Sequence, residues 1–143
     1  IESKPYLDAF AAAPQLSITS KACPLFVEFV ESGKTSGDEI TKIAQDYLSP
    51  MKQAQIDTLV LGCTHYPLLT GVISYVMGND VTLVSSAEET AKDLYRTLVE
   101  AGLLNDQVRP VSHRFVATAD PDKFATLAKR FLGPEVLAVS NKI

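Results

Sequence analysis

The chain has 143 residues, enough for one ordinary domain, and its 46% hydrophobic and 21% charged residues exclude a disordered or collagen-like protein. The formal net charge is −4 and no block of Lys and Arg occurs, so we expect no nucleic-acid partner. Apolar runs are far shorter than the ~18 residues of a membrane span, and no basic segment precedes an apolar stretch at the start, so we expect neither membrane insertion nor a secretory signal.

Apolar residues alternate between helical and strand spacing, which predicts an α/β fold with an open, mostly parallel sheet and flanking helices. Ser36-Gly37-Asp38-Glu39 has the form of a capping box at a helix start, and Pro50 is expected to break or kink that helix. In chain order we expect a helix over 3–13, a strand over 16–20, a helix over 24–33, a helix from 36 to about 50, a strand over 57–62, a helix over 68–78, a strand over 81–84, a helix over 86–99, a loop over 105–110, a strand over 115–117, a helix over 120–132 and a strand over 136–139.

The segment Gly62-Cys63-Thr64-His65-Tyr66-Pro67 concentrates chemically active side chains. It falls where a predicted buried strand meets a predicted helix, which is the edge at which open α/β sheets bind ligands. Gly62 permits a tight turn, and the N–H groups of the helix start can hold a carboxylate and raise the thiolate fraction of Cys63. Thr64 adds a hydroxyl group, and His65 adds an imidazole that titrates near neutrality. Packing alone does not explain this combination.

The two cysteines receive opposite interpretations. A lone cysteine after a strand is more often a core residue than a catalytic one, but Thr64 and His65 on the same turn favour a functional role for Cys63. Cys23 lies beside an apolar helix without a titratable neighbour, so we expect it to be structural. His113 is expected on the surface or in a loop, and the Cys and His spacings indicate no metal site. Two cysteines make no disulfide framework, which favours reduced thiols in the cytoplasm.

The stretch from Leu59 to Leu69, LVLGCTHYPLL, resembles the glutamate racemases of bacterial cell-wall synthesis. His65 favours glutamate, because the similar aspartate racemases tend to carry Glu at that position. Further segments resemble the same family at residues 3–6, at residues 22–27 together with Glu31, and at residues 115–120. The resemblance therefore extends over nearly the whole chain.

The resemblance implies a cofactor-independent isomerase that interconverts L- and D-glutamate and supplies D-glutamate for peptidoglycan in the cytoplasm. Two thiols on opposite faces of the α-carbon would remove and deliver the proton. By resemblance, Cys63 is one of these thiols, and Thr64 and His65 contact the substrate. His65 also assists proton transfer at Cys63, and Glu31 is a supporting acid on that side.

The family's other thiol lies in an upstream ACNTA-like segment, and DSG-type and PYG-type segments also touch the substrate; none of the three occurs in residues 1–143. We therefore expect the second half of the enzyme, one and a half domains of a two-domain, pseudo-symmetric racemase. Residues 1–84 would form most of the second domain and residues 85–143 would complete the first. Residues 86–143 would then expose an apolar face. Without an N-terminal half as partner the chain is expected to be inactive, and the resemblance leaves a homodimer open.

Three alternatives remain. One is an aspartate or other amino-acid racemase of the same superfamily, and another is an inactive half-enzyme that acts as a binding module. The third is a hydrolase or transferase with Cys63 as nucleophile and His65 as base, which would form a covalent acyl-enzyme. Residues two apart on a turn rarely supply the geometry that this third chemistry needs.

Overall fold

The computed structural model of the chain describes residues 5–105, 110, 112–118, 120–136 and 139–140. The chain divides into two compact units, Ile1–Gly102 and Leu103–Ile143. The first two residues of the helix predicted over 3–13 and most of the predicted loop at 105–110 lie outside the described residues. Among the helices in those residues, none has both the length and the apolar character needed to cross a membrane.

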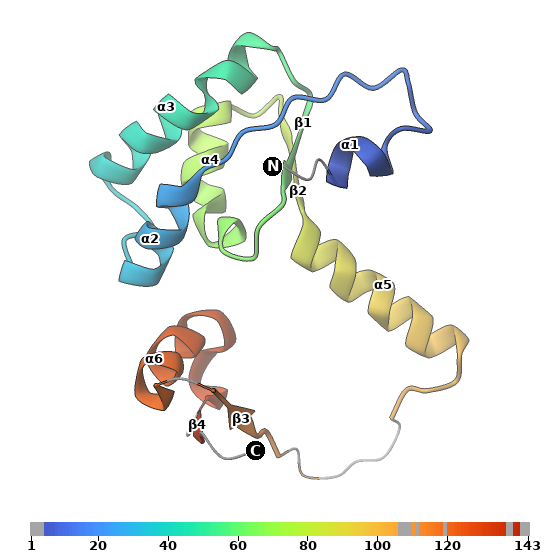
Figure 1. Cartoon of the computed structure of the whole chain (residues 1–143), viewed down its shortest axis with the longest axis vertical. Coiled ribbons are helices and arrows are strands. Elements are labelled where there is room, and N and C mark those ends of the chain that lie inside the picture. The colour runs from blue at the N-terminus through green and yellow to red at the C-terminus, as the bar shows by residue number, and fades with distance from the viewer. Residues whose placement is uncertain (1–4, 106–109, 111, 119, 137–138, 141–143) are drawn as a thin grey trace. The chain divides into compact units, whose positions relative to one another are not determined.

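The first unit is built around a parallel pair of strands, β1 and β2, in which Thr58 lies opposite Thr82 and Leu61 opposite Ser85. Parallel neighbours need a crossover connection, which η1 and α4 supply. Figure 1 shows α2, α3 and α4 on one side of the strands and α1 on the other. The elements are α1 (Pro5–Ala9), α2 (Pro24–Ser32), α3 (Asp38–Gln53), β1 (Thr58–Leu61), the 3₁₀ helix η1 (Tyr66–Leu69), α4 (Thr70–Met77), β2 (Thr82–Ser85) and α5 (Ser86–Glu100).

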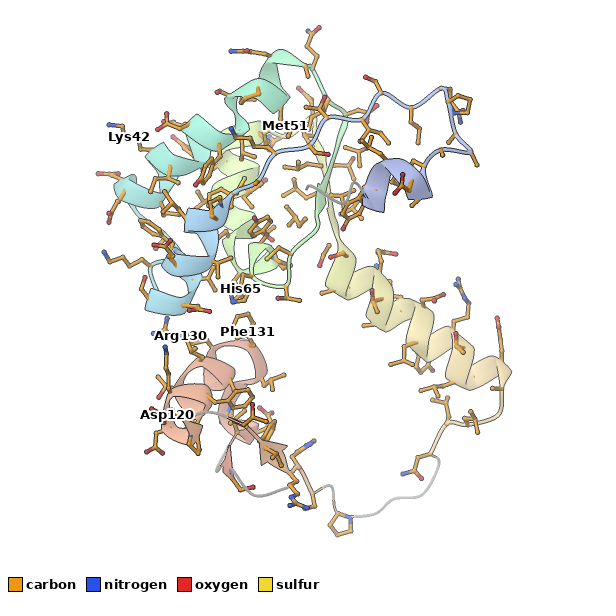
Figure 2. The ribbon with its side chains drawn as sticks, viewed as in Figure 1. Lys42, Met51, His65, Asp120, Arg130 and Phe131 are labelled. Carbon is orange, nitrogen blue, oxygen red and sulfur yellow. The ribbon has the colours of Figure 1, made fainter. Side chains whose placement is uncertain are left out.

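The second unit has the same strand–helix–strand order, with β3 (Phe115–Val116), α6 (Pro121–Leu132), the 3₁₀ helix η2 (Gly133–Glu135) and β4 (Val139–Ser140). β3 and β4 also pair in parallel. Asp120 caps α6, since its carboxylate accepts hydrogen bonds from the N–H groups of Asp122 and Lys123 at 3.0 and 3.2 Å (Figure 2). The predicted α/β class with parallel strands and flanking helices is confirmed.

The strand predicted at residues 16–20 is wrong, because this stretch has no regular secondary structure. In the described part of the first unit, β1 and β2 pair with each other, and the predicted strand has no neighbour there with which to form a ladder. Leu16 is 49% exposed, so the alternation of apolar residues in this stretch does not mark a buried face. Sequence alternation alone does not create a strand without a partner.

Two details of α3 also differ from the prediction. The capping box does not form: the N-cap is Gly37 at φ 102°, without a side-chain cap, and Glu39 pairs instead with Lys34 at 3.4 Å. Pro50 does not break the helix, which continues to Gln53. The Asp46 carbonyl, which receives no N–H from Pro50, accepts the Ser49 hydroxyl at 3.3 Å.

The core of the first unit lies between α2, α3, α4 and β1. Phe26 and Ile73 are 1% exposed and Ile40 is fully buried, and burial stabilises each such side chain by about 1.5–3 kcal/mol. By contrast α5 has no buried residue, and its Leu94 and Tyr95 are 58% and 62% exposed. This matches the exposed apolar face expected after residue 85.

The first prediction concerns the buried thiol of Cys23, which is 4% exposed. Burial raises the pKa of this thiol to about 11, against a lowering by the charge of Lys21. The unfolded chain ionises the thiol near pH 9.0 and the folded chain only near 11, so stability present below pH 9 is lost as the pH rises through this window. The loss approaches about 2–3 kcal/mol.

Urea unfolding between pH 8 and 11 measures this loss. Cys23→Ala should flatten the alkaline decline, whereas Cys63→Ala, which removes a half-buried thiol, should retain it. An unchanged alkaline slope in Cys23→Ala would contradict the assignment.

Candidate active site

The turn that follows β1 carries three of the predicted site residues. It leads directly into η1, because the Tyr66 N–H donates to the Cys63 carbonyl at 3.2 Å. Ser86, just after β2, donates its hydroxyl to the Leu61 carbonyl at 2.9 Å and ties the ends of the two strands together. Cys63 and His65 are half-buried and Thr64 is exposed. The turn therefore lies at the carboxyl edge of the parallel pair, as predicted.

His65 lies close to each of the other three predicted residues. Its Nδ1 is 3.2 Å from the Thr64 hydroxyl oxygen and 4.0 Å from the Cys63 sulfur. Its Nε2 is 3.5 Å from a carboxylate oxygen of Glu31, which extends from the last turn of α2. The structure thus brings together all four candidates, although Glu31 and the turn are far apart in the sequence.

This arrangement suits proton transfer. With the imidazole proton on Nε2, facing Glu31, the Nδ1 lone pair faces the thiol of Cys63 and the hydroxyl of Thr64. His65 can then accept a proton from the thiol while the carboxylate stabilises the resulting imidazolium. A sulfur–nitrogen distance of 4.0 Å is long, as catalytic hydrogen bonds often are before a substrate binds.

Gly62 serves this turn in a way that the sequence did not predict. Its φ is not among the positive values of the chain, so the turn does not need a left-handed glycine. Instead, a Cβ at Gly62 would lie 2.6 Å from the hydroxyl oxygen of Tyr6. The glycine therefore leaves room for the Tyr6 side chain beside the turn, which is a second role besides the predicted tight turn. Tyr6 was missed, although it lies in the segment at 3–6 that resembles the family.

Tyr66 was also missed as an individual residue. Its hydroxyl donates to the carbonyl of Cys23 at 3.1 Å, 43 residues away in the sequence. Burial raises the pKa of Tyr66, and the neighbouring thiols of Cys23 and Cys63 act in the same direction, against a lowering by the backbone hydrogen bond at Cys23. Its place within the segment at 62–67, next to His65, was the available signal.

The remaining predicted residues lie where expected. Cys23 is buried in the core, and His113 is exposed, with its ring 6.2 Å from that of Phe115. Among the residues that the structure describes, no group of three or more His, Cys, Asp and Glu side chains is placed to hold a metal ion.

Comparison with known proteins shows which enzymes this chain is similar to. No family model matches the chain. However, a glutamate racemase from Beutenbergia cavernae is 60% identical over 152 residues, which cover 100% of this chain and 52% of the relative. A glutamate racemase from Parafrankia sp. is 57% identical over 141 residues, 98% of this chain and 51% of the relative. The chain is a homologue of the glutamate racemases.

Solved structures agree. A glutamate racemase isoform from Bacillus anthracis matches 99% of this chain and 53% of its own, with a TM-score of 0.86 and 37% identity. The glutamate racemase from Francisella tularensis, solved in complex with D-glutamate, matches 94% and 50%, with a TM-score of 0.82 and 34% identity. The chain spans about half the length of the relatives that it matches. The resemblance noted in the sequence is confirmed.

A second prediction follows from the different exposure of the two cysteines. Iodoacetamide should modify the half-buried Cys63 at least about tenfold faster than the buried Cys23, because alkylation needs an accessible thiolate. Peptide mass spectrometry at pH 8 measures both rates. The Cys63→Ser variant should lose the fast phase, and faster labelling of Cys23 would contradict the assignment.

Proposed function

We propose that this chain supplies one face of the active site of a cofactor-independent glutamate racemase, with Cys63 as the acid–base thiol. The observation that carries the proposal is the contact of Cys63, His65 and Glu31 at the end of β1 in a homologue of these enzymes. The D-glutamate complex of the Francisella tularensis relative supports glutamate as the substrate. The reaction would take place in the cytoplasm and supply D-glutamate for peptidoglycan.

The proposed reaction begins at the weakly acidic α-carbon of glutamate. The Cys63 thiolate takes the α-proton as the C–H bond breaks, and the electron pair is held by the adjacent carboxylate. A second acid then delivers a proton to the opposite face, which inverts the centre. His65 returns Cys63 to the required protonation state, with Glu31 holding the imidazole. Thr64 would bind the substrate together with His65.

Cys23 does not suit the role of the second acid. Its thiol is buried in the core, and burial raises its pKa to about 11, so it holds its proton and does not meet a substrate. We therefore assign the second acid to a partner segment, an N-terminal half with its own thiol. In this scheme residues 1–84 form most of one domain and residues 85–143 complete the other. In this scheme α5 begins directly after the boundary at Ser85, and the partner segment would cover its exposed apolar residues.

One observation favours a second candidate function. Cys63 and His65, two residues apart, do approach to 4.0 Å, and Glu31 lies on the other side of the ring. A nucleophilic thiol of a hydrolase or transferase uses the same order of groups. Such an enzyme would form a covalent acyl intermediate, detectable by mass. Homology to racemases places this candidate second.

A chimera tests the proposed function. This chain would replace the matching half of the Beutenbergia cavernae relative, and racemisation would be followed by circular dichroism with glutamate and with aspartate. We expect glutamate racemisation that falls by at least about 10²-fold in Cys63→Ser, because the proton acceptor is lost. Cys23→Ala should retain it.

The same chimera in D₂O reports on each face of the substrate. Cys63→Ser should block α-proton exchange from one enantiomer more than from the other. Racemisation by the 143-residue chain alone, abolished by Cys63→Ser, would contradict the need for a partner, and binding of glutamate without exchange would indicate a binding module.

Glu31 provides a further prediction. Glu31→Gln in the chimera should lower kcat about 10- to 100-fold, within the range of general acid–base effects, because the imidazolium of His65 loses its carboxylate. Glu28→Gln changes an exposed residue one turn earlier on the same helix and should leave kcat unchanged. Steady-state kinetics measures both variants, and equal losses would show that charge on α2, rather than the contact with His65, is responsible.

A further inference from the structure

Two tyrosine hydroxyls hold the first turn of α2. The Leu25 N–H donates to the hydroxyl oxygen of Tyr47 at 3.4 Å, and the Tyr66 hydroxyl donates to the Cys23 carbonyl at 3.1 Å. Both rings meet Phe26 edge-on, with centroid distances of 5.3 and 5.5 Å and interplanar angles of 87° and 90°. Phe26 is 1% exposed, so the two tyrosines form matched contacts around one buried ring.

The two tyrosines connect α2 to different parts of the unit. Tyr47 belongs to α3 and joins one helix to another. Tyr66 follows His65 directly, so its hydrogen bond joins α2 to the turn that carries the site. At the other end of α2, Glu31 contacts His65 at 3.5 Å. The turn is therefore connected to both ends of the same helix.

The contact of Glu31 with His65 is too weak to set this geometry. The Glu31 side chain is 45% exposed, and ion pairs open to water contribute little and are screened by salt. The Tyr66 ring packs against the core, and its hydroxyl donates to the Cys23 carbonyl at 3.1 Å. The Cys23 carbonyl also accepts the Phe26 N–H at 3.1 Å, so the Tyr66 hydroxyl adds a second hydrogen bond to that carbonyl and ties it to the turn.

We propose that Tyr66 is a positioning residue, whose hydrogen bond to the Cys23 carbonyl fixes the turn against α2 so that His65 lies between Glu31 and Cys63. The effect of this hydrogen bond on catalysis rests on the proposed function. Its effect on the position of His65 concerns this chain alone and is measured without turnover.

The test compares Tyr66→Phe with Tyr47→Phe in the 143-residue chain. Both variants keep the aromatic ring that packs on Phe26, and each removes the one hydroxyl that hydrogen-bonds to the start of α2. The chain has two histidines, so ¹⁵N spectra resolve His65 with His113 as an internal reference. Tyr66→Phe should shift the His65 ring resonances and change the alkylation rate of Cys63 at least about threefold, the scale of one lost hydrogen bond. Tyr47→Phe should lower thermal stability yet leave both signals unchanged.

Restoring a donor provides the rescue. Tyr66→p-aminophenylalanine should return the His65 resonances and the Cys63 rate toward those of the unmodified chain. Tyr66→4-fluorophenylalanine keeps a para substituent without a donor, so it should not restore either signal. These two variants replace Tyr66→Phe in the test if Tyr66→Phe unfolds. Unchanged signals in the variants without a donor, or equal changes in Tyr47→Phe, would overturn the proposal.

The two proposals fail independently. An inactive chimera, together with the expected shift of the His65 resonances in Tyr66→Phe, would overturn the proposed function alone. An active chimera in which Tyr66→Phe alters neither the His65 resonances nor the Cys63 rate would overturn the role of Tyr66 alone.

Discussion

The burial of Phe26 is the constraint on which the site depends. This ring, 1% exposed, lies between the edges of Tyr47 and Tyr66 and thereby joins α2 to α3 and to η1. Each aromatic pair adds about 0.5–1.5 kcal/mol to the burial of the ring. Because α2 also carries Glu31, the packing at the start of the helix determines where a carboxylate lies near its end.

The polar contacts of the site then follow from this packed frame. The His65 ring lies 3.2 to 4.0 Å from groups of Cys63, Thr64 and Glu31, and the first two residues belong to the same turn as His65. The third, Glu31, comes from another helix and is partly exposed, so its own attraction to His65 is small. Apolar packing therefore holds α2 and η1 together, and the polar contacts of the turn and of Glu31 orient the His65 ring.

Sequence reasoning was most accurate where signals are local. The run Thr58–Leu61 followed by Gly62-Cys63-Thr64-His65 predicted both a parallel strand and the position of the site at its end, because strand burial and motif occupy adjacent residues. Glu31 was identified by resemblance alone, since it is 34 residues from His65 and nothing local joins them. The strand at 16–20 was predicted wrongly because pairing depends on a neighbour that alternation does not reveal. The hydrogen bond from Tyr66 to Cys23 was not predicted for a similar reason, because its two residues are 43 positions apart and nothing local joins them.

The contrast between the two cysteines shows what distinguishes a structural thiol from a candidate base. Cys23 begins the helix that Phe26 anchors, and the burial that makes it a good core residue also raises its pKa. Cys63 lies half-buried beside an imidazole, which can accept the proton that the thiol releases when it becomes a thiolate. Inversion at carbon requires proton exchange on two opposite faces, and one turn at the end of one strand can reach only one of them. The proposed function therefore assigns the second face to a partner segment, and α5, directly after the strand next to the site, has exposed apolar side chains.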